Sequence, residues 1–158
     1  MRIFGACAIL LSAIIFVRSY TRQKRRRVAV AGALLSFLIH AREGAARYLT
    51  PMSDIVGRIE DELLLSLGFR DEYMKSSSVY AAYTSVAEGY GGEIFTLLDA
   101  EFSALGRGYL CEEESRLCTA TDKIGACLDR EREACEKDIR VAGTLTVAAA
   151  LGIIILFL

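Results

Sequence analysis

Cysteine is the residue type in this sequence best suited to chemistry, as a metal ligand, a redox group or a nucleophile. Cys7 lies in an apolar run, and four further cysteines follow at separations of seven, nine and eight residues: Cys111, Cys118, Cys127 and Cys135. Structural zinc sites use close pairs such as C-x-x-C, and the chain has no such pair. We therefore interpret the cysteines as small buried apolar side chains and predict neither a metal nor a cofactor.

Two other features could bind or transform a ligand. His40 is the only histidine, and nucleophilic catalysis needs a base held against a nucleophile. The stretch GYGGE, residues 89–93, has the glycines of a phosphate-binding turn but lacks the Lys-Ser/Thr of a P-loop. We interpret His40 as an ordinary core or surface residue and GYGGE as a turn before a helix, so we predict no enzyme activity.

Charge is distributed unevenly along the chain, although the net charge is only −1. A basic collar lies within residues 18–27 and consists of Arg18, Arg22, Lys24, Arg25, Arg26 and Arg27. Apart from the collar and Arg2, 12 basic residues stand against 20 acidic ones. Proteins that bind nucleic acid spread positive charge over a folded face, so this acidic body predicts no nucleic-acid partner. Residues 129–138 carry acidic and basic side chains in alternation. This pattern suits a solvated helix face, and a docking surface is the alternative interpretation.

Residues 141–158 form an uncharged run of 18 residues that predicts a C-terminal transmembrane helix. A helix of this length covers about 27 Å, close to the ~30 Å hydrocarbon core of a bilayer. Within the run, Thr144, Ala148 and Gly152 recur every four residues, a spacing that lets helices pack closely in lipid. The spacing indicates that this helix packs either on the N-terminal apolar helix or on a helix of a partner. The partner can be a second copy of the chain, so a homo-oligomer is one of the possibilities.

Residues 3–17 form a shorter apolar run whose length also suits a signal peptide. The basic flank that follows favours an uncleaved anchor over residues 3–20, in which Arg18 and Tyr20 reach the headgroup level. Positive charge is retained on the cytoplasmic side of a membrane. We therefore expect a cell-membrane protein with both termini outside and residues 21–140 in the cytoplasm, the collar contacting anionic lipid.

The central region predicts an all-α fold, a small bundle of about five or six helices between two terminal transmembrane helices, because apolar residues recur at spacings of three and four. Thr50 is expected to cap a helix over 51–67 with Pro51 at its first position, and Gly68 to close it. Ser77 or Ser78 is expected to cap a later helix that carries Tyr80 and Tyr83 on its surface. A helix over 93–105 follows with Gly106 as its stop, and a last helix runs from about 110 into the terminal span.

Three local motifs resemble the stage III sporulation protein AB family of endospore-forming bacteria. ARYLTPMSDI carries the Thr-Pro turn, here Thr50 and Pro51, at which one helix ends and the next begins. LLDAEFSALGRG carries a Phe-x-x-Leu-Gly element, here Phe102, Leu105 and Gly106, although Ser103 stands where the family often has Gly. EKDIRVAGTL resembles the charged segment that leads into the last transmembrane span of the family.

The resemblance implies a non-enzymatic component of a membrane channel complex between mother cell and forespore, in the mother-cell membrane. It also implies a helical domain like that of type II secretion platform proteins, with other channel subunits and a cytoplasmic ATPase as partners. The alternative function is a small membrane-bound redox or metal-sensing protein that uses the cysteines.

Overall fold

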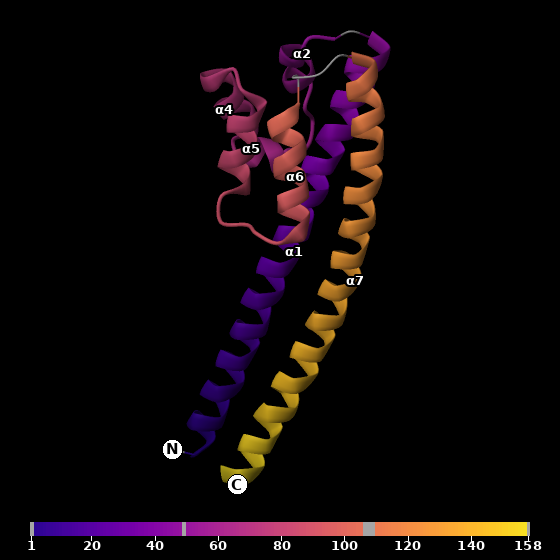
Figure 1. The fold of residues 1–158 in the computed structure, drawn as a ribbon. Helices are drawn as coiled ribbons and strands as arrows, with labels where there is room; N and C mark the ends of the chain where they lie inside the picture. Colours follow the sequence, from indigo (N-terminus) through magenta and orange to yellow (C-terminus); the bar gives the residue numbers. More distant parts are fainter. Residues whose placement is uncertain (1, 49, 106–109, 158) are drawn as a thin grey trace. The chain divides into compact units, whose positions relative to one another are not determined.

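The computed structural model describes residues 2–48, 50–105 and 110–157. Of these, the side chains of residues 2–7, 9, 10, 45–48, 110–113, 154, 156 and 157 are not described. Over the described residues the chain is all-α, with seven helices and no strand (Figure 1). This confirms the predicted fold class at the level of helix content.

Two long helices account for more than half of the chain. Helix α1 covers Arg2–Tyr48 in 47 residues, and α7 covers Leu110–Phe157 in 48 residues. Each joins an apolar terminal run to a part of the central region without a break, because neither contains a proline. The predicted continuity of the last helix with the terminal run is confirmed.

The helix predicted over 51–67 is wrong in its extent, because two short helices replace it. Helix α2 covers Met52–Gly57 and α3 covers Glu62–Ser66. The break has a local cause: the carboxylate of Asp61 accepts hydrogen bonds from the N–H groups of Leu63 and Leu64, at 2.9 and 3.1 Å, and starts a new helix there. Gly68 follows in the left-handed conformation at φ 78°, as predicted.

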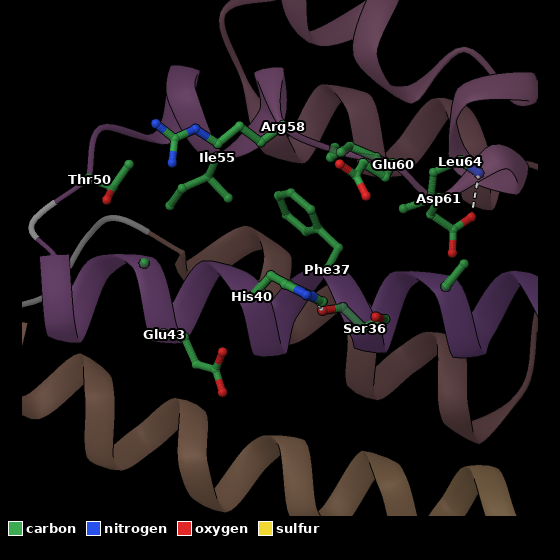
Figure 2. Close-up of a pocket in the computed structure, with 13 residues that line it drawn as sticks. Ser36, Phe37, His40, Glu43, Thr50, Ile55, Arg58, Glu60, Asp61 and Leu64 are labelled. Atoms are coloured by element: carbon green, nitrogen blue, oxygen red, sulfur yellow. Dashed lines mark hydrogen bonds between the residues drawn. The ribbon is translucent and has the colours of Figure 1, made fainter.

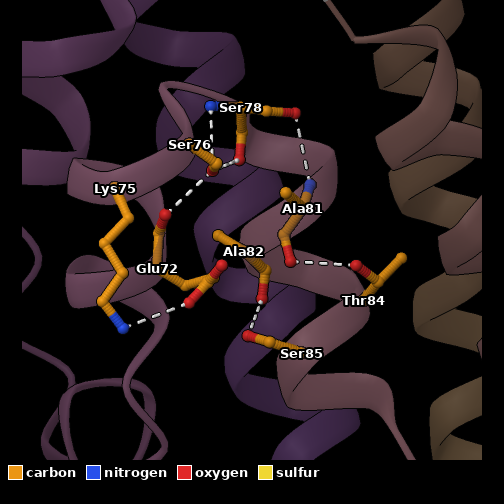
Figure 3. A network of polar contacts seen from close by, with 8 residues as sticks. All are labelled: Glu72, Lys75, Ser76, Ser78, Ala81, Ala82, Thr84 and Ser85. Carbon is orange, nitrogen blue, oxygen red and sulfur yellow. Dashed lines mark hydrogen bonds and ion pairs between the residues drawn. The ribbon is translucent and has the colours of Figure 1, made fainter.

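Helices α4, Phe69–Ser76, and α5, Val79–Ala87, meet at a serine-rich corner. Figure 3 shows that the hydroxyl of Ser78 accepts the N–H of Ala81, at 3.2 Å, which confirms Ser78 as the predicted cap. In the same network the hydroxyl of Ser76 donates to the carbonyl of Glu72 at 2.8 Å, at the end of α4. Serine hydroxyl groups thus form hydrogen bonds with backbone groups at the end of α4 and at the start of α5.

Helix α6 covers Glu93–Ala104 and follows the GYGG turn. Gly89 and Gly92 take φ values of 83° and 104°, which only glycine adopts without strain, so the prediction of a turn is confirmed. The predicted stop at Gly106 lies outside the described residues.

The chain divides into two compact units. Unit 1 comprises residues 1–27 and 130–158, and unit 2, the body, comprises residues 28–129. The predicted membrane segments, residues 3–20 and 141–158, fall in unit 1 and include several of the side chains that are not described. Among the residues that are described, no helix combines the length and the apolar character needed to cross a bilayer.

Four aromatic rings form the centre of the body's core, one each from α1, α4, α5 and α6. The Tyr83 and Phe102 rings stack with centroids 4.5 Å apart, and the Phe37 and Phe69 rings lie 5.0 Å apart. All four side chains are at most 4% exposed. Tyr83, which was predicted on the surface, is therefore a core residue, because α5 turns this face toward Phe102.

Candidate functional site

A groove in the body combines an apolar wall with polar side chains. It has a volume of about 540 Å³ and lies between α1 on one side and α2, α3 and the segment joining them on the other (Figure 2). Its inner wall is apolar and includes Ala33, Phe37, Ile55 and Leu64. A cavity of this size accommodates a few side chains of a partner.

The rim of the groove is charged. Glu43, Glu60 and Asp61 contribute three carboxylates, while Arg58 contributes one guanidinium group. In Figure 2 the side chain of Glu43 points away from Arg58, on the other side of α1. The excess of acidic over basic groups favours a partner segment that brings positive charge to an apolar contact.

His40 lines the groove but is not arranged for catalysis. Its Nδ1 lies 2.8 Å from the carbonyl oxygen of Ser36, one helical turn earlier. A carbonyl only accepts, so in the neutral ring Nδ1 carries the proton and Nε2 is an acceptor. The hydrogen bond involves the carbonyl of Ser36 and not its hydroxyl, so it does not pair a base with a nucleophile.

The Thr-Pro motif forms the end of the groove. The backbone N–H of Thr50 donates to the carbonyl of Gly44 at 3.2 Å, which folds the chain back over the end of α1. The prediction that Thr50 caps the next helix is wrong: Pro51 holds the capping position, and its carbonyl accepts from Asp54 and Ile55 at 3.0 and 3.2 Å. The shift follows from Pro51, whose extended ψ of 145° keeps it outside the helix.

Gly44 is needed for this close approach. A Cβ on Gly44 would lie 2.9 Å from Cδ1 of Ile55, so a larger residue would displace that side chain and reshape the groove. The motif therefore builds the end wall of the groove.

The second motif lies in the core. Phe102 is 1% exposed and belongs to the aromatic cluster, and Leu105 is half-buried and packs against the core. Gly106 lies outside the described residues. Both described residues therefore stabilise the packing of the core.

The described cysteine side chains do not gather into one site. Cys118 is exposed, so its interpretation as a buried side chain is wrong, whereas Cys127 and Cys135 are buried as predicted. The side chains of Cys7 and Cys111 are outside the described set. Among the described side chains, no three histidine, cysteine or acidic groups come close enough together to hold a metal ion.

In unit 1 the collar splits into two sets. Lys24 forms an ion pair with Asp138 of α7 at 3.1 Å, and Arg27 forms one with Glu131 at 3.1 Å. The hydrogen bond to Asp138 raises the pKa of Lys24, and the nearby Tyr20 ring, 5.6 Å from the ammonium group, adds to this. Arg18, Arg22, Arg25 and Arg26 are exposed.

The two ion pairs identify a seam between antiparallel segments of α1 and α7 that the sequence analysis missed. On α1 the half-buried residues Ala13, Val17, Tyr20, Lys24 and Arg27 follow one another at steps of four and three residues. Steps of four and three residues are the spacing of paired helices. This spacing can be read from the sequence and would have predicted the seam. Most side chains of the run 129–138 are exposed, as a solvated face predicts, but Glu131 and Asp138 also form ion pairs with α1.

The three small residues of the terminal run lie off this seam. Thr144, Ala148 and Gly152 are exposed, and the buried small residue is Ala150, at 4% exposure. A Cβ on Gly152 would meet no atom within 4 Å. Packing of Thr144, Ala148 and Gly152 on another helix stays a prediction about a partner.

Comparison of the chain with protein families, with curated proteins and with solved structures finds no match in any of the three. The geometry of the groove, the seam and the collar therefore carries the functional argument.

Proposed function

We propose that this protein is a non-enzymatic, membrane-anchored assembly factor whose helical body docks another subunit of a channel or secretion-like complex. The observation that carries the proposal is the groove of about 540 Å³, with its apolar wall and its charged rim. Protein–protein interfaces combine an apolar centre with a polar rim in the same way.

The composition of the body supports a basic partner segment. Three carboxylates and one guanidinium group line the rim, and acidic residues also predominate in the chain outside the collar. The resemblance to the stage III sporulation protein AB family points to a cytoplasmic ATPase of the same complex as this partner, at the mother-cell membrane.

The membrane anchor is part of the same proposal. Its support is the apolar composition of residues 3–17 and 141–158, and the basic collar that follows the first run. Within unit 1, α1 and α7 run antiparallel (Figure 1), as two spans with both termini on one side of a membrane would. Large apolar side chains such as Ile15, Phe16 and Leu145 are 65–66% exposed there, as lipid-facing residues are.

The test is capture of the candidate ATPase by the full-length protein in membranes. Glu60→Lys reverses a rim charge in the groove, and we expect it to weaken capture about tenfold, as loss of a well-placed interfacial charge does. Asp122→Lys makes the same change at an exposed site on α7 outside the groove and should leave capture unchanged.

Equal capture by wild type and by a folded Glu60→Lys variant would rule out the groove as the docking site. Extraction of the full-length protein from membranes by alkaline carbonate would rule out the anchor.

A further inference from the structure

The basic collar has two faces with different surroundings. At 100° per residue, Arg18, Arg22, Arg25 and Arg26 fall within an arc of about 100° on α1. Tyr20, Lys24 and Arg27 fall on the opposite side, which contacts α7. No ion pair or hydrogen bond joins the four exposed arginines to the part of the chain that the structure describes. We call these four residues the arginine stripe.

The arginine stripe continues an exposed apolar stripe on the same side of α1. Leu11 and Ile15 fall within the same arc and Ile14 lies about 20° outside its edge, and their side chains are 60%, 66% and 60% exposed, respectively. One helix face thus changes from apolar to basic between Ile15 and Arg18. A free polyanion or an acidic protein would contact only the charged part of this face, whereas a lipid surface contacts both parts.

The length of the stripe fits a lipid headgroup region. The rise of 1.5 Å per residue places Arg26 about 12 Å beyond Arg18, and a headgroup layer is about 5–8 Å thick. Arg18 and Arg22 then lie among the phosphates, with Arg25 and Arg26 within a Debye length of them. Lys24 and Arg27 are already neutralised by Asp138 and Glu131.

We propose that the arginine stripe is a binding surface for anionic phospholipid headgroups, and that Lys24 and Arg27 instead hold α1 and α7 in register. This inference rests on the proposed membrane anchor and divides the collar between two tasks. A guanidinium group suits the first task because it donates two hydrogen bonds to one phosphate.

The test reconstitutes the full-length protein in bilayers of phosphatidylcholine that contain spin-labelled phosphatidylglycerol, and measures its association relative to spin-labelled phosphatidylcholine. The variant Arg22→Gln with Arg25→Gln removes two stripe charges, and we expect the preference for phosphatidylglycerol to fall at least about fivefold. High salt should remove the wild-type preference.

The matched control removes the two ion pairs as pairs, by Lys24→Gln with Asp138→Asn and Arg27→Gln with Glu131→Gln. It also takes two positive charges from the collar, but it leaves the local net charge unchanged, so the preference should persist. Circular dichroism of both variants checks that they are folded.

An unchanged preference in the stripe variant would overturn the inference, as would an equal loss in the control. A stripe variant that keeps its lipid preference but fails to capture a partner would show a protein interface instead. In each of these results, retention of the protein in carbonate-washed membranes shows that the anchor itself stands, while release from them shows that the proposed function has failed.

Discussion

The fold strongly controls the ionisation of the Tyr83 side chain. Its hydroxyl donates to the carbonyl oxygen of Phe95 at 2.9 Å, and its ring packs on Phe102. Burial raises the pKa of Tyr83 to about 12, and the negative charge of Asp99 and the nearby Tyr80 act in the same direction. The folded protein therefore keeps this proton at a pH at which an unfolded tyrosine loses it.

This shift predicts a loss of stability at high pH. Below pH 10 both states hold the proton and the contribution of Tyr83 is complete. Between pH 10 and pH 12 only the folded state holds it, so the free energy of unfolding falls by up to about 1.4 kcal/mol per pH unit. We expect Tyr83→Phe to cost about 1 kcal/mol at pH 7, and this deficit to shrink as the pH rises toward 12. Urea unfolding of the full chain in detergent from pH 7 to 11.5 measures both effects.

Tyr80→Phe is the matched control, because Tyr80 is 38% exposed and its hydroxyl bonds Asp99 at 3.1 Å. That variant should keep most of the wild-type pH dependence. If Tyr83→Phe loses stability with pH as steeply as wild type, another group is responsible.

At the scale of the element, α3 depends on its cap. It has five residues, too few to be stable as an isolated helix, and it carries the buried Leu64 into the wall of the groove. Asp61→Ala removes an acceptor for two backbone N–H groups and should cost about 1 kcal/mol, or about 2–4 °C in Tm for a chain of this size. Thermal unfolding measures the change.

Asp61→Asn separates the cap from the charge. An asparagine caps a helix about as well as an aspartate, so this variant should unfold near the wild-type temperature. If the Asn variant is destabilised as much as the Ala variant, the negative charge matters more than the cap.

The pairing of α1 with α7 is also a property of elements. The Lys24–Asp138 pair is about half exposed, which limits its contribution to about 1 kcal/mol or less. We expect Lys24→Glu to destabilise the seam by that amount and the swap Lys24→Glu with Asp138→Lys to recover most of it. A double-mutant cycle on thermal unfolding measures the coupling, and no coupling would mean that the pair does not set the register.

At the scale of the whole molecule, the central question is which side of the membrane the body faces. Cys118 offers a native probe, since its side chain is exposed while Cys127 and Cys135 are 3% and 8% exposed. With Cys7→Ser and Cys111→Ser in place, we expect an impermeant maleimide to label no cysteine in intact cells and one per chain after permeabilisation.

The control is full denaturation, which should expose all three remaining thiols. Labelling of Cys118 from outside intact cells would contradict the proposed orientation. The variant with Cys7→Ser and Cys111→Ser also tests the redox alternative. Normal assembly of this variant would exclude a role for those two residues.

The sequence by itself determined the features that depend on nearby residues. Helical spacing predicted an all-α chain, Ser78 was predicted as one of two possible caps, and the GYGG glycines predicted a turn. These predictions succeed because helix hydrogen bonds, caps and turns are made within about four residues of each other. The membrane segments, the partner and the function stay predictions of composition and resemblance.

Only the tertiary structure decided which side chains meet across long separations. The sequence grouped six basic residues as one collar, and the structure splits them, because Lys24 meets Asp138, 114 residues away. It likewise moves Tyr83 from the surface into the core and closes a groove between α1 and α3. Contacts of this kind depend on how packed helices align in register, and that register is set by the summed packing of many side chains, which no short stretch of sequence contains.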